Sequence, residues 1–334
     1  MLNRLLCSIA ILPCLLVTGA AQTRKTTVTK TWIVPLTKDG HPDLEGTWRS
    51  KSATPLERPK ELEGRQFLTD DEVAELKRRA DRLFKDGRSD FAAGDKFFLA
   101  LLANPERFKS STATSDSSTV DREFDNRTSL ITDPPDGKLP PYTTLGGQRL
   151  AAFQAAAGGR VATGKPEDLN SDQRCITFGV PMLGNNYSNG PNAYYQIVQA
   201  ENQVMIFTES IHDARIIPMD GRPHLPANMR TWNGDSRGRW EGKTLVVDTT
   251  NFSATTNFMG AAEDLHLVER FTRVAADEIH YEITIDAPST WSRAWTAMVR
   301  LKQSDDRLYE FACHEGNAEI METMLTGARL TSPK

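Results

Sequence analysis

The sequence predicts a mainly β protein with an N-terminal α-helical region, and a change in its hydrophobic pattern leads to that prediction. Between residues 69 and 157 apolar residues recur at helical spacing, whereas from Cys175 onwards they alternate with polar residues. About eight strand-like segments follow one another there with short turns, which favours an antiparallel up-and-down barrel or a strongly curved sheet. A β-sandwich of two sheets is the alternative that the same strands permit.

The first 21 residues have the three parts of a secretory signal peptide. A short start with Arg4 precedes an almost wholly apolar stretch over residues 5–17, and residues 18–21 are small. We therefore expect a periplasmic or secreted protein, in which residues 22–40 form a polar leader segment. No later stretch approaches about 18 apolar residues, so the sequence predicts no membrane span once the signal peptide is removed.

Residues 41–170 are predicted to supply a first strand and a helical region that packs on the barrel. His41 to Trp48 form a turn that leads into a strand. Thr69 and Glu72 have the spacing of a capping box, in which each side chain pairs with the backbone N–H of the other, and this marks the start of a helix. A further helix is expected from Leu145 to Ala157.

Residues 171–334 are predicted to form the antiparallel β-barrel domain. Segment 279–285 alternates apolar and polar residues in the manner of a half-buried strand. Residues 235–239 are interpreted as a turn held by ion pairs, and a last helix over 318–325 is expected to pack across one end. The predicted strands are 194–199, 204–208, 214–218, 244–250, 265–274, 279–285, 291–301 and 308–313.

Cysteine usage agrees with export. Cys7 and Cys14 leave with the signal peptide, and Cys175 and Cys313 remain. In an oxidising compartment we expect these two to form a disulfide, with two buried thiols as the alternative. The bridge would tie the middle of the chain to its end and would contribute about 4–5 kcal/mol in the chain-entropy account.

Composition and motif content disfavour several classes of function. Loss of the signal peptide removes Arg4 and no acidic residue, so the formal net charge moves from −4 to −5 and nucleic acid is not an expected partner. The motifs of serine hydrolases, P-loops and dinucleotide-binding folds are absent. No histidine pair has structural zinc spacing, so no cofactor is predicted, and a divalent metal held between separate strands is a minor alternative.

Acid–base chemistry by histidine and carboxylate is the remaining candidate. His212 with Asp213, and His314 with Glu315, stand at the ends of predicted strands, where pocket rims are usually built. A histidine titrates near neutrality, so it can exchange a proton with a bound substrate. We therefore predict that His212, Asp213 and His314 are catalytic and that Arg215 and Glu315 bind substrate.

Further contacts with substrate are predicted along the strands. By period 2, Glu269 shares the apolar face of its strand with Leu267 and Phe271, so inside a barrel it would be removed from water. Large aromatic residues dominate cores, so the tryptophans fit a core or barrel lining better than a carbohydrate-stacking platform. The further residues predicted to contact substrate are His266, Arg270, Glu282, Trp291 and Trp295.

Long strings in the chain resemble a family of secreted bacterial proteins. The strings are HDARIIPMDGRPH, GDSRGRWEGKTLVVDTTNF, LHLVERFTRV and YEFACHEGN, with PDLEGTW near the start and FDNRTSLITDPPDGKLP before the middle. They cover nearly the whole mature chain, and the resemblance implies an exported single-chain protein. A weaker, lipocalin-like resemblance rests on Gly46-Thr47-Trp48 and the strand order, and the helical region departs from the lipocalin pattern.

These observations predict an exported enzyme that acts on a small, partly apolar substrate by acid–base chemistry of the lyase, isomerase or hydratase type. The alternatives are a non-catalytic periplasmic protein that binds an apolar ligand and an envelope interaction module. An enzyme predicts that His212 and His314 converge within about 10 Å at a cavity, beside a carboxylate. A binding protein predicts a deep apolar cavity with these groups turned outward to solvent, and an interaction module predicts no cavity and a broad exposed apolar patch.

Overall fold

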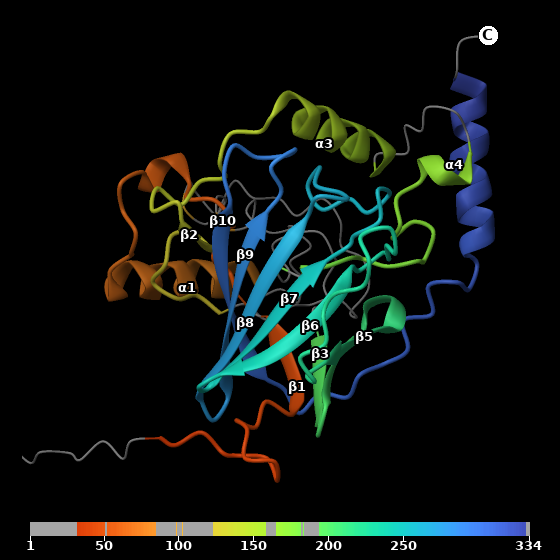
Figure 1. Cartoon of the computed structure of the whole chain (residues 1–334). Coiled ribbons are helices and arrows are strands. Elements are labelled where there is room, and N and C mark those ends of the chain that lie inside the picture. The colour runs from red at the N-terminus through yellow and green to blue at the C-terminus, as the bar shows by residue number, and fades with distance from the viewer. Residues whose placement is uncertain are drawn as a thin grey trace, which may run out of the picture. The chain divides into compact units, whose positions relative to one another are not determined.

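The strands form one antiparallel, barrel-shaped sheet that is nearly closed (Figure 1). This computed structural model describes residues 32–50, 52–84, 98, 102, 123–157, 165–181, 183 and 194–331. The strands are β1 (Gly46–Ser50), β2 (Ile131–Asp133), β3 (Tyr194–Ala200), β4 (Gln203–Thr208), β5 (Asp213–Pro218), β6 (Asp235–Glu241), β7 (Thr244–Thr250), β8 (His266–Ala275), β9 (Glu278–Asp286) and β10 (Trp295–Gln303). Their spatial order is β5-β4-β3-β1-β10-β9-β8-β7-β6, with β2 paired to β10. The predicted antiparallel barrel is confirmed.

The N-terminal strand belongs to the barrel itself. β1 lies between β3 and β10 and pairs with both, so that Trp48 stands opposite Tyr195 and Gln303. Trp48 is fully buried, its Nε1 donates to the carbonyl oxygen of Leu44 at 2.8 Å, and the Arg273 guanidinium carbon lies 5.2 Å from its ring centroid. β1 therefore joins β3, from the middle of the chain, to β10, from near its C-terminal end, in one continuous sheet.

The sheet has two edges, β5 and β6, which face each other at a seam. Among the described residues no hydrogen-bonded ladder joins these two strands. Gly238 of β6 permits their close approach, because a Cβ there would clash with Sδ of Met219 and lie 2.9 Å from Cγ2 of Ile217. At the seam these strands therefore meet through side-chain packing, and the barrel is nearly closed.

β6 corrects the interpretation of residues 235–239 as a turn. The strand pairs with β7 from Asp235 opposite Thr250 to Glu241 opposite Thr244. Its buried residues are Asp235, Ser236 and Gly238, none of which is a large apolar residue, so hydropathy does not show the alternation that marks a strand. The predicted strand 308–313 is also wrong, because those residues belong to no described strand and precede a helix.

The barrel interior holds the main hydrophobic core. Alternate residues of β8, β9 and β10 point inward, as period 2 predicts, and Leu267, Ile283 and Val299 are fully buried. Trp291 and Trp295 belong to the same core and meet edge to face, with ring centroids 5.5 Å apart.

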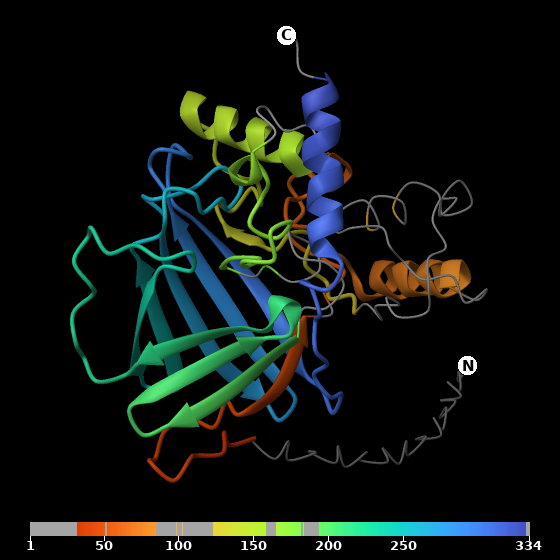
Figure 2. The ribbon, with the colours of Figure 1, turned by 90° about the vertical axis from the view of Figure 1, so that its right-hand side faces the viewer.

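Three helices accompany the barrel in the described residues: α1 (Asp70–Phe84), α3 (Thr144–Ala157) and α4 (Asn317–Thr331). The predicted capping box of α1 is confirmed, since the Thr69 N–H donates to Oε2 of Glu72 at 2.8 Å and the Glu72 N–H donates to Oγ1 of Thr69 at 3.3 Å. α3 and α4 lie at the same end of the barrel (Figure 2). A short 3-10 helix, η6 (Ser210–His212), leads into β5.

Residues 34–334 form one compact unit. The predicted signal peptide, residues 1–21, and most of the predicted leader segment, residues 22–40, lie outside the described residues. Within the described part of the chain, no helix has the length and apolar character needed to cross a membrane.

Candidate functional site in the barrel

The barrel encloses a small cavity, which we call the inner chamber. Its volume is about 30 Å³, enough for one or two water-sized groups, since a water needs roughly 10–15 Å³ on this scale. Val180, Ile206 and Phe271 supply apolar walls. Polar side chains from β3, β4, β5, β8 and β9, together with Asn233 and the backbone at Gly179, line the remainder.

An ion pair crosses the inner chamber from β5 to β8. Nη2 of Arg215 lies 2.7 Å from Oε2 of Glu269, and these side chains are 11% and 1% exposed. The Tyr281 hydroxyl donates to Oε1 of Glu269 at 2.5 Å. Burial, and next the carboxylate of Glu269, raise the pKa of Tyr281 well above its usual value, so this hydroxyl is neutral. Burial is the largest single influence on Arg215 and would lower its pKa, but the charge and hydrogen bond of Glu269, together with Tyr281 and Asp213, outweigh burial and the pKa is raised.

One donor of Arg215 has no acceptor. Its Nε is buried, and no described residue accepts a hydrogen bond from it, although buried donors nearly always have a partner. Among the described lining residues there are one guanidinium, Arg215, and two carboxylates, Glu269 and Asp213, so the formal charge of these walls is −1. Because Glu269 already neutralises Arg215, the spare N–H suits the oxygen of an uncharged group better than a second carboxylate.

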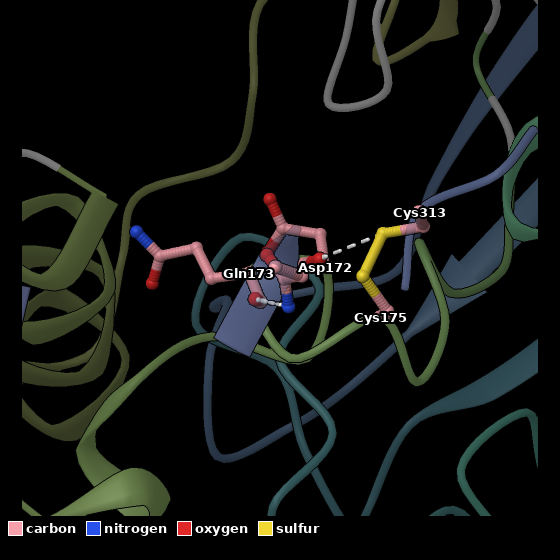
Figure 3. The surroundings of a disulfide bond; sticks show 5 residues. Asp172, Gln173, Cys175 and Cys313 are labelled. Atoms are coloured by element: carbon pink, nitrogen blue, oxygen red, sulfur yellow. Dashed lines mark hydrogen bonds between the residues drawn. A yellow bond between two sulfur atoms is a disulfide. The ribbon is translucent and has the colours of Figure 1, made fainter. Parts of the chain in front are cut away.

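Asp213 is held at the chamber wall by two neighbours. The Thr177 hydroxyl donates to Oδ2 of Asp213 at 2.5 Å, and Nδ2 of Asn233 donates to the same oxygen at 2.6 Å. No described residue hydrogen-bonds Oδ1, so that oxygen is available to a molecule in the chamber. The Cys175–Cys313 disulfide lies two residues before Thr177 and ties this wall to the segment that precedes α4 (Figure 3).

A larger cavity, which we call the outer chamber, borders the inner one. Its volume is about 170 Å³, and its walls come from α3, residues 171–180, Trp232 and residues 256–259. Gly179 and Val180 line both chambers, so this short backbone stretch forms a shared wall. An apolar cavity of about 150 Å³ can hold a benzene ring, so the outer chamber has room for a molecule of that size.

Four predicted site residues lie at the surface. The His212 side chain is exposed, and its backbone is left-handed with φ of 42°. His314 and Glu315 are exposed before α4, and Glu282 is exposed on β9. Neither chamber includes any of these four side chains. Asp213 is the predicted catalytic residue that lines the inner chamber, and the predicted convergence of His212 and His314 at a cavity is not seen at either chamber.

The other predicted contacts divide between the outer face and the core. His266 lies 3.0 Å from Oδ1 of Asp248, and Arg270 pairs with Glu241 at 2.9 Å. Both residues are on the opposite face of β8 from Glu269. Trp291 and Trp295 are in the hydrophobic core, in agreement with the preference for a core position. Arg215 is the predicted substrate-binding residue that lines the inner chamber.

Several chamber residues were not predicted as site residues. Period 2 placed Glu269 on the apolar face of its strand, but it could not identify Arg215 as the partner of this carboxylate. The same alternation places Tyr281 on the apolar face of its strand. Nothing in the sequence predicts that Thr177 or Asn233 contacts Asp213. These contacts join segments that are far apart in the chain.

The described residues contain no group of three or more histidine, cysteine or acidic side chains arranged to hold a metal ion. Comparison of the chain with protein-family models, with curated proteins and with solved structures finds no match.

Proposed function

We propose that this chain is an exported protein that binds a small, partly apolar, uncharged molecule, with a polar group of that molecule in the inner chamber. The observation that carries the proposal is the buried Nε of Arg215, which points to an acceptor that the described residues do not supply. We infer export from the predicted signal peptide and from the disulfide. An exported protein would be in the periplasm or outside the cell.

Charge and position support binding. A ligand carboxylate would bring the formal charge of the inner chamber to about −2 in a site removed from water. A carbonyl or hydroxyl can instead accept from Arg215, and a hydroxyl can also donate to Oδ1 of Asp213. The exposed side chains of His212 and His314 agree with what a binding protein predicts.

Equilibrium dialysis against a pool of uncharged metabolites, read by mass spectrometry, tests the proposal. Ile206 lines the inner chamber, so Ile206→Phe should fill it and abolish retention of the bound species. Val198 is 38% exposed on the neighbouring strand, so Val198→Phe should leave retention unchanged. Retention of no compound, or equal retention by both variants, would contradict the proposal.

A second candidate is an acid–base enzyme of the lyase, isomerase or hydratase type. Asp213, with an uncommitted oxygen at the inner chamber, favours it, because a general base must reach the proton that it removes. Such chemistry should incorporate solvent deuterium into a retained compound, or change its mass by one water. Asp213→Asn should abolish the change while binding persists, and retention without any chemical change would leave binding as the function.

A further inference from the structure

The outer chamber has the composition of a cation-binding site. Its walls include four aromatic side chains, Phe153, Phe178, Trp232 and Phe258, and one ionisable side chain, Asp172. No lysine, arginine or histidine is among the lining residues that the structure describes. Aromatic faces carry negative quadrupole potential, and cages of such rings beside a carboxylate recognise organic ammonium ions.

Asp172 has no cationic partner among the described residues. Burial raises the pKa of this carboxyl, and the backbone N–H groups of Asp172 and Gln173 lower it less. Its carbonyl oxygen accepts from the N–H of Cys175 at 3.0 Å. The same oxygen lies 4.0 Å from Sγ of Cys313, so this turn is beside the disulfide (Figure 3). A half-buried carboxylate held in this way is stabilised by a cation that enters the chamber.

The aromatic walls are held in place by neighbours outside the chamber. Phe178 meets Phe311 edge to face at 5.9 Å, and Phe258 stacks with Trp295 at 6.5 Å between centroids. The guanidinium carbon of Arg174 lies 5.9 Å from the centroid of Trp232 and does not line the chamber. This distance is within the range of a cation–π contact, and Arg174 adds a positive charge near the chamber that would oppose a second one.

We propose that the outer chamber is a binding site for a small organic cation of the alkylammonium class, which differs in charge from the molecule whose uncharged polar group occupies the inner chamber. The cavity volume limits the cation to about one ring or a trimethylammonium group with a short tail. Asp172 supplies the opposite charge, and the aromatic walls supply the desolvated surface.

Calorimetric titration of the full chain with choline tests this site. The uncharged isostere 3,3-dimethylbutan-1-ol and the anionic 3,3-dimethylbutanoate have nearly the same shape, so they isolate the effect of charge. We expect choline to bind at least about tenfold more tightly than either isostere, a difference of about one cation–π or charge contact. Equal affinities, tighter binding of the anion, or no binding of choline would each overturn the proposal.

Two variants that remove charges of opposite sign should change choline affinity in opposite directions. Asp172→Asn should weaken choline binding about tenfold without changing the affinity for the alcohol. Arg174→Gln should tighten choline binding several-fold, because it removes a like charge, and this outcome does not depend on the fold of the first variant. Ile206→Phe fills the inner chamber alone and should leave choline binding unchanged, so failure of one site is distinguishable from failure of the other. If Arg174→Gln weakened choline binding, the charge argument would be overturned.

Discussion

Arg215 and Glu269 link two strands across the barrel. Removal of two charges from water costs several kcal/mol per ion, and their attraction offsets that cost only when both partners are present. Tyr281 adds a hydrogen bond to the carboxylate. Because β5 is one edge of the seam and β8 lies two strands beyond the other edge, the pair holds the open side of the barrel together.

Loss of the buried carboxylate should destabilise the fold far more than loss of an exposed one. Glu269→Gln leaves the Arg215 guanidinium buried without its counter-charge, and we expect it to lower the free energy of unfolding by about 3–5 kcal/mol in urea denaturation. Glu241→Gln is the matched control, because Glu241 pairs with Arg270 on the outer face and should cost less than about 1 kcal/mol. Similar losses in both variants would show that the pair does not hold the seam.

The outer-face pair of His266 and Asp248 should make stability depend on pH. The hydrogen bond to Asp248 raises the pKa of His266 above 6.5, and the hydrogen bond from His266 lowers the pKa of Asp248 below 3.8. The His266 contribution is therefore present below pH 6.5 and lost as pH rises through the raised pKa. The Asp248 contribution is present above pH 3.8 and lost as pH falls through the lowered pKa.

The pair should therefore stabilise the fold most between about pH 4 and 6.5, by about 0.2–1 kcal/mol, because both side chains are partly exposed. In thermal unfolding from pH 3 to 9, His266→Gln should flatten the decline above pH 6.5. His314→Gln, which alters an exposed histidine before α4, should leave the profile unchanged. An unchanged profile for His266→Gln would exclude the pair as its source.

At the scale of elements, α3 reaches the barrel through glycine. A Cβ on Gly146 would lie 2.5 Å from the carbonyl oxygen and 2.7 Å from the Cα of Thr290, and these backbone atoms cannot move independently. On Gly147 a Cβ would meet nothing within 4 Å. The outer chamber depends on this approach, since Leu150 and Phe153 of α3 line it.

Alanine at these two positions should have opposite effects on stability. Gly146→Ala should cost about 1–3 kcal/mol by overpacking, and choline binding should weaken because α3 is displaced. Gly147→Ala should stabilise the protein by up to about 1 kcal/mol through helix propensity. Differential scanning calorimetry of both variants checks the prediction, and a stabilising Gly146→Ala would contradict the packing of α3 through Gly146.

Strand β6 was predicted as a turn, and its residues explain why. Asp235 accepts from the Leu225 N–H at 2.9 Å and pairs with Arg237 at 2.6 Å, so the ion pairs expected of a turn are present. However, these contacts hold the end of a strand. Its buried residues Ser236 and Gly238 are not hydrophobic, so no apolar alternation indicates a strand. Pairing with β7 makes it a strand, and that pairing is a long-range property.

For the whole molecule, the Cys175–Cys313 disulfide joins positions 138 residues apart. We expect the double variant Cys175→Ser, Cys313→Ser to lose about 5 kcal/mol of stability in the chain-entropy account. Reduction of the native protein should lower the melting temperature to a similar extent, and reductant should not affect the double variant. Equal melting temperatures of native and double-variant proteins would mean that the bridge constrains the unfolded chain little.

The sequence by itself determined the class of fold, because strand and helix periods are local and α1 carries its own capping signal at Thr69 and Glu72. It also determined that Glu269 lies on the apolar face of its strand and that Cys175 and Cys313 can pair. Only the tertiary structure decided which charges meet. Arg215 reaches Glu269 across the barrel, Asp213 is held by Thr177 and Asn233, and His212 and His314 remain at the surface. These contacts depend on strand register and barrel closure, which arise when distant segments pack together and have no local pattern in the chain.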